Sequence, residues 1–401
     1  MRLASPLRIA AQLFALSTPA LVTACSDSPV EPSPKPAFSL SPAKTFTTID
    51  LGQVNRPSEA RAINAAGQVV GDEGSSGDLN GFVWESGTLT IIHPDVPRTS
   101  PVIAAALGNN AQGQVVGFVQ FLTGGGVSHA YLWDDGVMTN LGTLPGGNAS
   151  FGLAINRRGE VVGSATTASG AIHAFLWAQG TMVDLGTLPG GASSAAMAIN
   201  SRGDVLGTAA TVSGATHAFL WAQGTMVDLG TLGGDLTLPA AINARGDVVG
   251  TSTTASGATH AFLWAGGTMV DLGTLGGSGS RATAINRLGE VVGSATTASG
   301  ATHAFLWAQG TMVDLGTLPG GSFSVATAIN GRGEMAGGAT TSGGFEHAVV
   351  WAQGTMVDLG TLGGNFSFAT AINLRGDVVG WAHNVVGDRH ATLWTRHNRT
   401  P

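Results

Sequence analysis

Eight copies of a unit of about 43 residues make up most of this chain of 401 residues. Tryptophans recur at a nearly constant spacing, an Asn-x-x-Gly turn does the same, and both markers count eight units. The stretch HAFLWAQGTMVDLGTL at 173–188 returns unchanged at 217–232 and 303–318. Such a period is typical of repeat architectures, in which each unit buries its apolar surface against its neighbours.

The sequence of each unit predicts four short strands and no helix. The third unit illustrates this, with strands expected at 153–156, 160–166, 173–177 and 181–186. Turns separate the first strand from the second and the third from the fourth, and they place Gly159 and Gly180 where a hairpin favours positive φ. Asn156 can brace its turn through its side chain. Each unit is therefore predicted to form two local antiparallel hairpins.

The side-chain pattern indicates how these strands are buried. In the strand HAFLW, Phe175 and Trp177 point to one face, while Ala174 and Leu176 point to the other. Both faces are apolar, whereas a sheet with one wet face would alternate apolar and polar residues. Each sheet should therefore be covered on both sides, as in the stacked blades of a β-propeller.

The two ends of the repeat are incomplete in complementary ways. Residues 47–52 read TTIDLG, which matches a fourth strand, but no third strand precedes them. The last unit ends at HATLW (390–394) without a fourth strand. We therefore predict an all-β fold, a β-propeller of eight four-stranded blades over residues 45–397. The N-terminal strand completes the last blade, closes the ring and removes two open edges.

The N-terminus has the features of an export signal. Arg2 and Arg8 precede an apolar run, and Cys25 is the only cysteine in the chain. This ending resembles the lipobox of bacterial lipoproteins, which implies cleavage after residue 24 and lipidation of Cys25. Residues 25–44 are rich in proline and are predicted to form a tether. We expect a lipid-anchored protein of the outer membrane or cell surface.

The motifs HAF, DLGTL and AIN-x-x-G resemble the HAF-repeat family of probable extracellular proteins. The resemblance covers residues 47–394. It implies export and a repeat architecture, and it implies no particular activity. HAY, HAV and HAT replace HAF at 129–131, 347–349 and 390–392, and the first unit has no histidine at this position.

The repeated histidines have two interpretations. They could bind a metal, but equivalent atoms in stacked sheets lie about 10 Å apart, whereas the ligands of one zinc lie about 2 Å from it. We therefore predict no metal and no cofactor, and a structural role in which each histidine bonds the aspartate of the next strand or a backbone carbonyl. The residues predicted to fix the blades are His173, Trp177, Asp184, His217, Trp221, Asp228, His260, Trp264, Asp271, His303, Trp307 and Asp314.

A specific site is expected where the repeats diverge. Divergent segments lie in the first two units, and the last unit adds Trp381, His383, Asp388 and His390. The candidate acid–base residues are Asp72, Glu73, Asp78, His93 and Asp95. No pair among them has convincing spacing, and drift in terminal repeats explains them as well. Known catalytic motifs are absent from the sequence.

These observations favour a non-catalytic exported lipoprotein, a scaffold that binds a protein partner or a glycan at the cell envelope. Alternatives are a propeller hydrolase or lyase acting on extracellular polysaccharide, and a purely structural envelope protein, so enzymatic activity stays open. The net charge of −7 argues against nucleic acid as a partner. We expect a monomer held at the membrane by its lipid.

Overall fold

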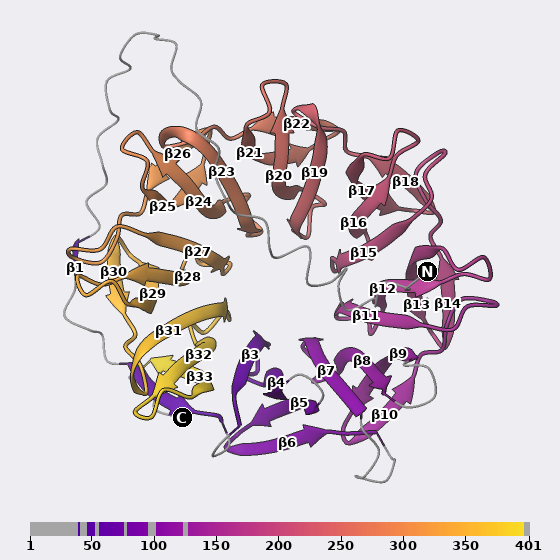
Figure 1. Cartoon of the computed structure of the whole chain (residues 1–401), viewed down its shortest axis with the longest axis horizontal. Coiled ribbons are helices and arrows are strands. Elements are labelled where there is room, and N and C mark those ends of the chain that lie inside the picture. The colour runs from indigo at the N-terminus through magenta and orange to yellow at the C-terminus, as the bar shows by residue number, and fades with distance from the viewer. Residues whose placement is uncertain are drawn as a thin grey trace. The chain divides into compact units, whose positions relative to one another are not determined.

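The computed structural model describes residues 39–40, 46–52, 56–75, 78–94, 102–122 and 127–396. Within these ranges every regular element is a β-strand (Figure 1). No described segment is a helix long and apolar enough to cross a membrane. The predicted signal peptide (1–24), Cys25 and most of the predicted tether (25–44) lie outside the described residues.

The strands pair with their neighbours along the chain into antiparallel sheets of four. The first four sheets are formed by β3 (Ser58–Ile63), β4 (Val69–Ser75), β5 (Asp78–Glu85) and β6 (Thr88–Ile92); β7 (Val102–Asn109), β8 (Val115–Phe121), β9 (Ser128–Asp134) and β10 (Val137–Asn140); β11 (Ser150–Ile155), β12 (Val161–Thr166), β13 (Ile172–Ala178) and β14 (Thr181–Asp184); and β15 (Ser194–Ile199), β16 (Val205–Ala210), β17 (Thr216–Ala222) and β18 (Thr225–Asp228). The next sets are β19 (Gly233–Ile242), β20 (Val248–Thr254), β21 (Thr259–Ala265) and β22 (Thr268–Asp271); β23 (Gly276–Ile285), β24 (Val291–Thr297), β25 (Thr302–Ala308) and β26 (Thr311–Asp314); and β27 (Ser324–Ile329), β28 (Met335–Thr340), β29 (Glu346–Ala352) and β30 (Thr355–Asp358). The last sheet consists of β31 (Gly363–Ile372), β32 (Val378–Asn384), β33 (Arg389–Arg396) and β2 (Phe46–Asp50).

Two pairings extend this scheme. A single parallel pair, Thr216 with Leu236, joins β17 to β19 and so links two sets of four strands into one hydrogen-bonded sheet of eight. The short strand β1 (Ser39–Leu40) pairs in parallel with β30 and makes that sheet five-stranded. Because β1 lies within the predicted tether, part of the proline-rich stretch contacts the folded repeats instead of only spanning the distance to them.

The third unit shows how closely the predicted strands match the observed ones. The expected strand at 181–186 ends at Asp184 because the Gly186 amide donates to Asp184 Oδ1 at 2.7 Å and Gly186 takes a φ of 74°. The turn glycines Gly159 and Gly180 have φ of 76° and 83°, as predicted. Asn156 braces its turn by accepting from the Arg158 amide at 2.9 Å.

A β-bulge interrupts the first strand of every unit. In β11 the register shifts between Gly152 and Ala154, and the other seven first strands shift at the same place. The glycine of the second strand stands opposite this bulge. A Cβ added to Gly163 would lie 1.8 Å from the Phe151 carbonyl oxygen. The repeated Val-Val-Gly pattern therefore marks the close backbone approach that the bulge requires.

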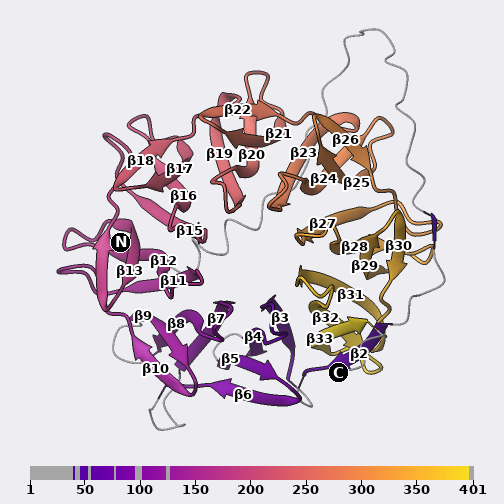
Figure 2. The ribbon, with the colours of Figure 1, turned by 180° about the vertical axis from the view of Figure 1, so that it is seen from behind.

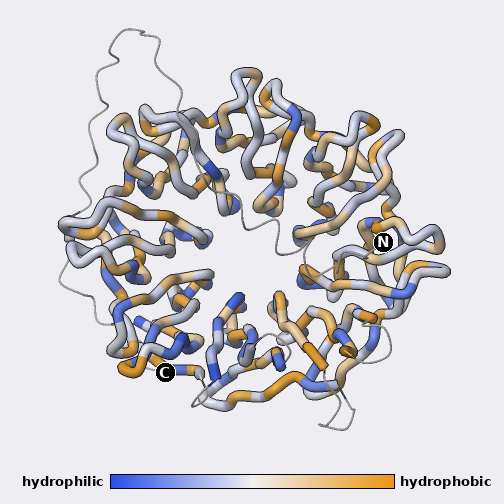
Figure 3. Tube along the Cα trace, viewed as in Figure 1, coloured by the Kyte–Doolittle hydropathy of each residue, from blue (hydrophilic) through white to orange (hydrophobic). Residues whose placement is uncertain are grey.

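Each sheet packs on both faces, as the side-chain pattern predicts. Ala174 and Phe175 of β13 are both fully buried. Ala174 belongs to a cluster with Ala196 and Phe219 of the next sheet, and Phe175 to one with Val116 of the previous sheet. Apolar residues are consequently spread over all the sheets rather than gathered in one core (Figure 3).

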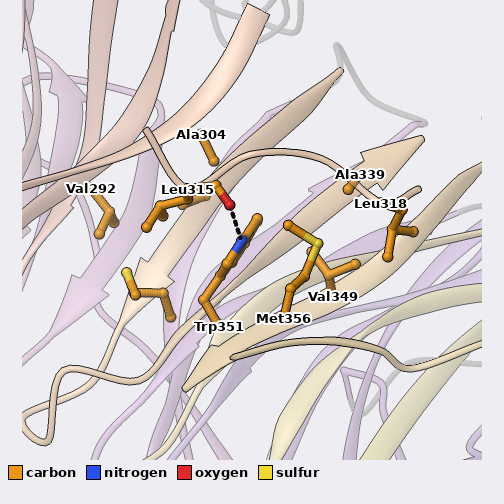
Figure 4. Close-up of a cluster of buried hydrophobic side chains, with 10 residues drawn as sticks. Val292, Ala304, Leu315, Leu318, Ala339, Val349, Trp351 and Met356 are labelled. Atoms are coloured by element: carbon orange, nitrogen blue, oxygen red, sulfur yellow. Dashed lines mark hydrogen bonds between the residues drawn. The ribbon is translucent and has the colours of Figure 1, made fainter. Parts of the chain in front are cut away.

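The repeated tryptophans contribute to these inter-sheet clusters. Trp351 of β29 is fully buried, and its Nε1 donates to the Leu315 carbonyl of the preceding repeat at 3.3 Å (Figure 4). Met356 of β30 lies in the same cluster. The tryptophans therefore hold neighbouring sheets together through packing.

The two ends of the repeat region meet in one sheet. Strand β2 pairs antiparallel with β33, the pairing that the two incomplete units predict (Figures 1 and 2). Leu51, which follows β2, is buried with Ala60 and Phe82 of the first sheet and with Ala391 and Leu393 of the last. The first and last sheets thus share a hydrophobic cluster, as sequential sheets do.

Candidate functional site

Most of the repeated polar residues bond to one another or to the backbone. His173 Nδ1 lies 2.9 Å from Asp184 Oδ2 across the β13–β14 hairpin, which places the histidine as donor to the carboxylate. The equivalent pairs are His217–Asp228, His260–Asp271, His303–Asp314, His347–Asp358 and His390–Asp50. The His390–Asp50 pair joins the C-terminal strand to the N-terminal one, so the pairing of β2 with β33 restores a contact made within single hairpins elsewhere.

The second unit varies this pair. Asn140 replaces the aspartate, and its Nδ2 donates to His129 Nδ1 at 3.0 Å, which reverses the direction of the hydrogen bond. The tryptophans take no part in these pairs: Trp177 lies opposite Met182 and packs between sheets. In the described part of the chain, no three His, Cys, Asp or Glu side chains gather where they could hold a metal ion.

The turn asparagines connect every unit to the next. Asn156 Nδ2 donates to the Asn200 carbonyl at 3.1 Å, and Asn200 donates in turn to the Asn243 carbonyl. The same bond joins Asn64 to Asn110, Asn110 to Asn156, Asn243 to Asn286, Asn286 to Asn330 and Asn330 to Asn373. The series returns to its start because Asn373 Nδ2 donates to the Asn64 carbonyl at 3.3 Å. Sequence reasoning assigned these asparagines only to their own turns.

Arginines at the same turns also bond to the next unit. Arg202 Nη2 contacts Asp204 Oδ2 at 2.5 Å and the Arg245 carbonyl at 2.6 Å. A hollow of about 240 Å³ between these two turns is lined by both arginines, Asp204, Asp247 and Trp264. Because both arginines are engaged with the acids of their own turns, this hollow offers little free charge to a ligand.

Asp72, the first candidate acid, is a buried ion-pair partner. It bonds Arg61, and its Oδ1 accepts from the Ala106 amide of the next sheet at 2.9 Å. Burial raises the pKa of the Asp72 carboxyl, while Arg61 and the amide act in the opposite direction. Tyr131 packs nearby, donates its hydroxyl to the Ala105 carbonyl at 2.8 Å, and has a pKa raised by burial. The bond from the Ala106 amide to Asp72 joins the first two sheets, whereas the Tyr131 bond lies within the second.

Glu73 and Asp78 share one arginine. Arg56 Nε lies 3.1 Å from Glu73 Oε1, and Arg56 Nη1 lies 3.2 Å from Asp78 Oδ2. His93 Nδ1 donates to the Pro94 carbonyl at 2.7 Å. Asp95 lies outside the described residues. The structure therefore places Glu73 and Asp78 around the Arg56 guanidinium, while Asp72 pairs with a different arginine, Arg61.

An aromatic cluster lies where the last unit meets the preceding one, formed by Phe345 of the turn before β29 and by Phe366, Phe368, Trp381 and His383 of the last unit. The ring centroids of Phe345 and Phe366 lie 5.4 Å apart, those of Phe366 and His383 5.5 Å, and those of His383 and Trp381 5.4 Å. Phe368 stacks on Trp381 across β31 and β32 at 6.3 Å. The sequence pointed to Trp381 and His383 as departures from the repeat, but it did not identify their phenylalanine partners.

Two charged residues flank the aromatic cluster. Arg389 lies over the Trp381 ring at 5.6 Å and bonds Glu59 of the first sheet at 3.2 Å. Glu346 begins β29, and burial raises the pKa of its carboxyl. A Cβ added to Gly338 would lie 2.6 Å from Glu346 Oε1 and 2.7 Å from the Phe368 ring, so this glycine makes room for both.

A hollow of about 270 Å³ lies beside the aromatic cluster. Phe366 and His383 line it together with Asn365, Asn384 and the exposed turn residues Val385 and Val386. The Asn384 side chain accepts from two amides of its own turn. His390, also expected among the divergent groups, is instead buried in its pair with Asp50.

The comparisons with known proteins give distant likenesses only. No family model matches the chain, and no curated protein matches it, so the resemblance to the HAF-repeat family stays an expectation. Among solved structures, the β-propeller domain of the Trilobed protease from Pyrococcus furiosus is 7% identical, with a TM-score of 0.42 over 84% of this chain and 93% of that chain. A putative TolB from Agrobacterium tumefaciens is 14% identical, with a TM-score of 0.38 over 55% of this chain and 81% of that one. The fungal lectin of Aleuria aurantia is 15% identical, with a TM-score of 0.32 over 55% and 78%.

Proposed function

We propose that this chain is a closed, eight-bladed β-propeller that acts as a non-catalytic binding scaffold at the cell envelope. The asparagine series supports the architecture, because its hydrogen bonds pass through eight units and return from Asn373 to Asn64. The pairing of β2 with β33 supports closure at the same junction.

The engagement of the repeated polar groups is the observation that carries the scaffold role. The histidines pair with aspartates, and the turn asparagines bond the next unit. The asparagines are buried, and a buried polar group whose hydrogen bonds are made fixes the structure and leaves little capacity for chemistry. The side chains left to recognise a protein or a glycan are those that differ between units, above all the aromatic cluster.

A polysaccharide hydrolase would need two carboxylates about 5–10 Å apart across a cleft, one of them free to donate a proton. Asp72 is instead bonded to Arg61, and Glu73 and Asp78 to Arg56. These arrangements favour binding over hydrolysis.

The scaffold role predicts binding without turnover. We expect the purified protein to retain at least one cell-envelope polysaccharide or envelope protein from a panel, with no new reducing ends or unsaturated sugars released on prolonged incubation. Retention is measured by affinity electrophoresis and products by reducing-end and ultraviolet assays. Release of product that Asp72→Asn abolishes would favour the hydrolase or lyase, and retention of nothing would leave the purely structural role.

Export and lipidation give a second prediction. We expect Cys25→Ala to move the protein from the membrane fraction to the aqueous fraction, because a single cysteine at the cleavage site is the only attachment point for lipid in this chain. Cell fractionation with immunoblotting measures this shift, and Cys25→Ala protein that stays with the membrane would contradict the lipobox. Ser26→Ala serves as the control, since it keeps the cysteine.

A further inference from the structure

We propose that the hollow beside the aromatic cluster binds an uncharged sugar ring, with Phe366 and His383 as its platform; this inference rests on the proposed scaffold and names its ligand class. A sugar presents an apolar face of C–H groups and an edge of hydroxyls. Sites for such ligands combine aromatic surface with a few polar groups that fix orientation.

The combination of a phenylalanine with a histidine in this hollow is specific to the last unit, as comparison with other units shows. Strands β31 and β32 align with β19 and β20 through the same register, which places Phe366 at the position of Leu236 and His383 at that of Thr253. In the unit of β23 and β24 the residues are Gly279 and Thr296. In the unit of β27 and β28 they are Phe323 and Thr340, so the phenylalanine recurs in the preceding unit and the His383 ring beside it is the addition of the last unit.

The turn that follows β32 also carries exposed apolar side chains. Val385 and Val386 are 80% and 76% exposed; the unit of β20 has Ala255 and Ser256 there and the unit of β16 has Val212 and Ser213, so Val386 is the residue that differs from both. Side chains as exposed as these contribute little to packing. Apolar side chains exposed beside an aromatic surface are typical of a binding site. The lining contains no charged side chain, which suits an uncharged ligand.

His383 stands where other units have a threonine, and this difference removes a hydrogen bond that the threonine hydroxyl accepts. In the unit of β19, Thr253 Oγ1 accepts from the Leu236 amide at 3.0 Å, and Thr296 does the same for Gly279. Over the described residues, the Phe366 amide has no corresponding side-chain acceptor, because His383 stands in that place. Asn365 and the His383 ring, which line the hollow, supply donors and acceptors for hydroxyl groups.

The size of the hollow sets the length of ligand it holds. Its volume of about 270 Å³ lies just under the range of about 300–1,000 Å³ that encloses drug-sized molecules. It therefore accommodates one ring, and a longer chain would extend from it past Trp381 and Arg389.

The test uses substitutions that the fold already carries in other units. We expect methyl glycosides of neutral hexoses and N-acetylhexosamines to bind the purified protein in saturation-transfer NMR, and methyl glucuronide to bind more weakly. The double variant Phe366→Leu and His383→Thr should weaken binding by about tenfold or more, since it removes both ring contacts and a hydrogen-bonding group.

A pair of valines supplies the matched control. Val212 occupies the position of Val385 in the unit of β16 and is equally exposed, at 80%. Val385→Ala should weaken glycoside binding, whereas Val212→Ala should leave it unchanged, with equal thermal midpoints for both. Glycosides that bind the double variant as well as the unaltered protein would overturn this site while leaving the scaffold role intact. If no glycoside binds but an envelope protein is retained, the sugar class is wrong and the scaffold again survives.

Discussion

Removal of residues 45–52 should lower the free energy of unfolding by at least about 3 kcal/mol, since burying one leucine contributes roughly 1.5–3 kcal/mol and each ladder hydrogen bond about 0.5–1.5 kcal/mol. The deletion removes Leu51 from the cluster between the first and last sheets and takes Asp50 from His390. It also leaves β33 with an open edge, so we expect aggregation as well as a lower midpoint in urea.

The control for this deletion removes eight residues, 27–34, from the proline-rich stretch that the sequence predicts to lie outside the fold. That protein should unfold at the same urea concentration as the full chain. An unchanged midpoint and a monodisperse protein after loss of 45–52 would contradict closure of the proposed propeller by β2.

Gly293→Ala should destabilise the protein by about 1–3 kcal/mol, the range for overpacking a close-packed site. A Cβ at Gly293 would lie 1.9 Å from the Arg281 carbonyl oxygen and 2.9 Å from Ala282 Cα. Neither neighbour is a flexible side chain, so the backbone of β23 or β24 must move. Denaturation in urea measures the loss, and circular dichroism checks that the strands persist.

Gly108→Ala is the matched control for this clash. Gly108 lies in β7 at the bulge, where the equivalent residues Ala154 and Ala198 already carry a Cβ. The nearest atom to a Cβ at Gly108 is 3.7 Å away, an ordinary contact. We expect no loss of stability there. If Gly293→Ala and Gly108→Ala changed the free energy of unfolding equally, the conformational entropy of the backbone, rather than the close approach at Gly293, would determine that change.

The sequence was informative where the determinants of structure are local. Hairpins such as β13–β14 follow from Gly180 and from apolar residues on both faces, and the pairing of β2 with β33 follows from counting strands. The aspartate was one of two partners predicted for each histidine, because folding HAFLW back on TMVDLG brings the two side chains to one end of a hairpin, and the structure shows this pair.

The features that the sequence did not predict are one contact within a sheet and two contacts between units. The Val-Val-Gly pattern was read only as strand, although a glycine inside a strand is a signal for a bulge. The asparagine bond from Asn156 to the Asn200 carbonyl needs the offset of two stacked sheets. The aromatic cluster joins Phe345, from the turn before β29, with Phe366 of β31 and Trp381 of β32, and their spacing along the chain does not predict that they meet.

The pairing of β2 with β33 has a consequence for the order of events during synthesis. Nearly all other strand pairs form between neighbours along the chain and can assemble as soon as each hairpin is free to fold. Strand β2 is synthesised early, and it cannot pair until its partner β33 has been synthesised near the end of the chain. Meanwhile every finished third strand, such as β13, offers it an almost identical docking edge until its own fourth strand follows. Rapid closure of each local hairpin is thus what keeps the first-made strand available for the last.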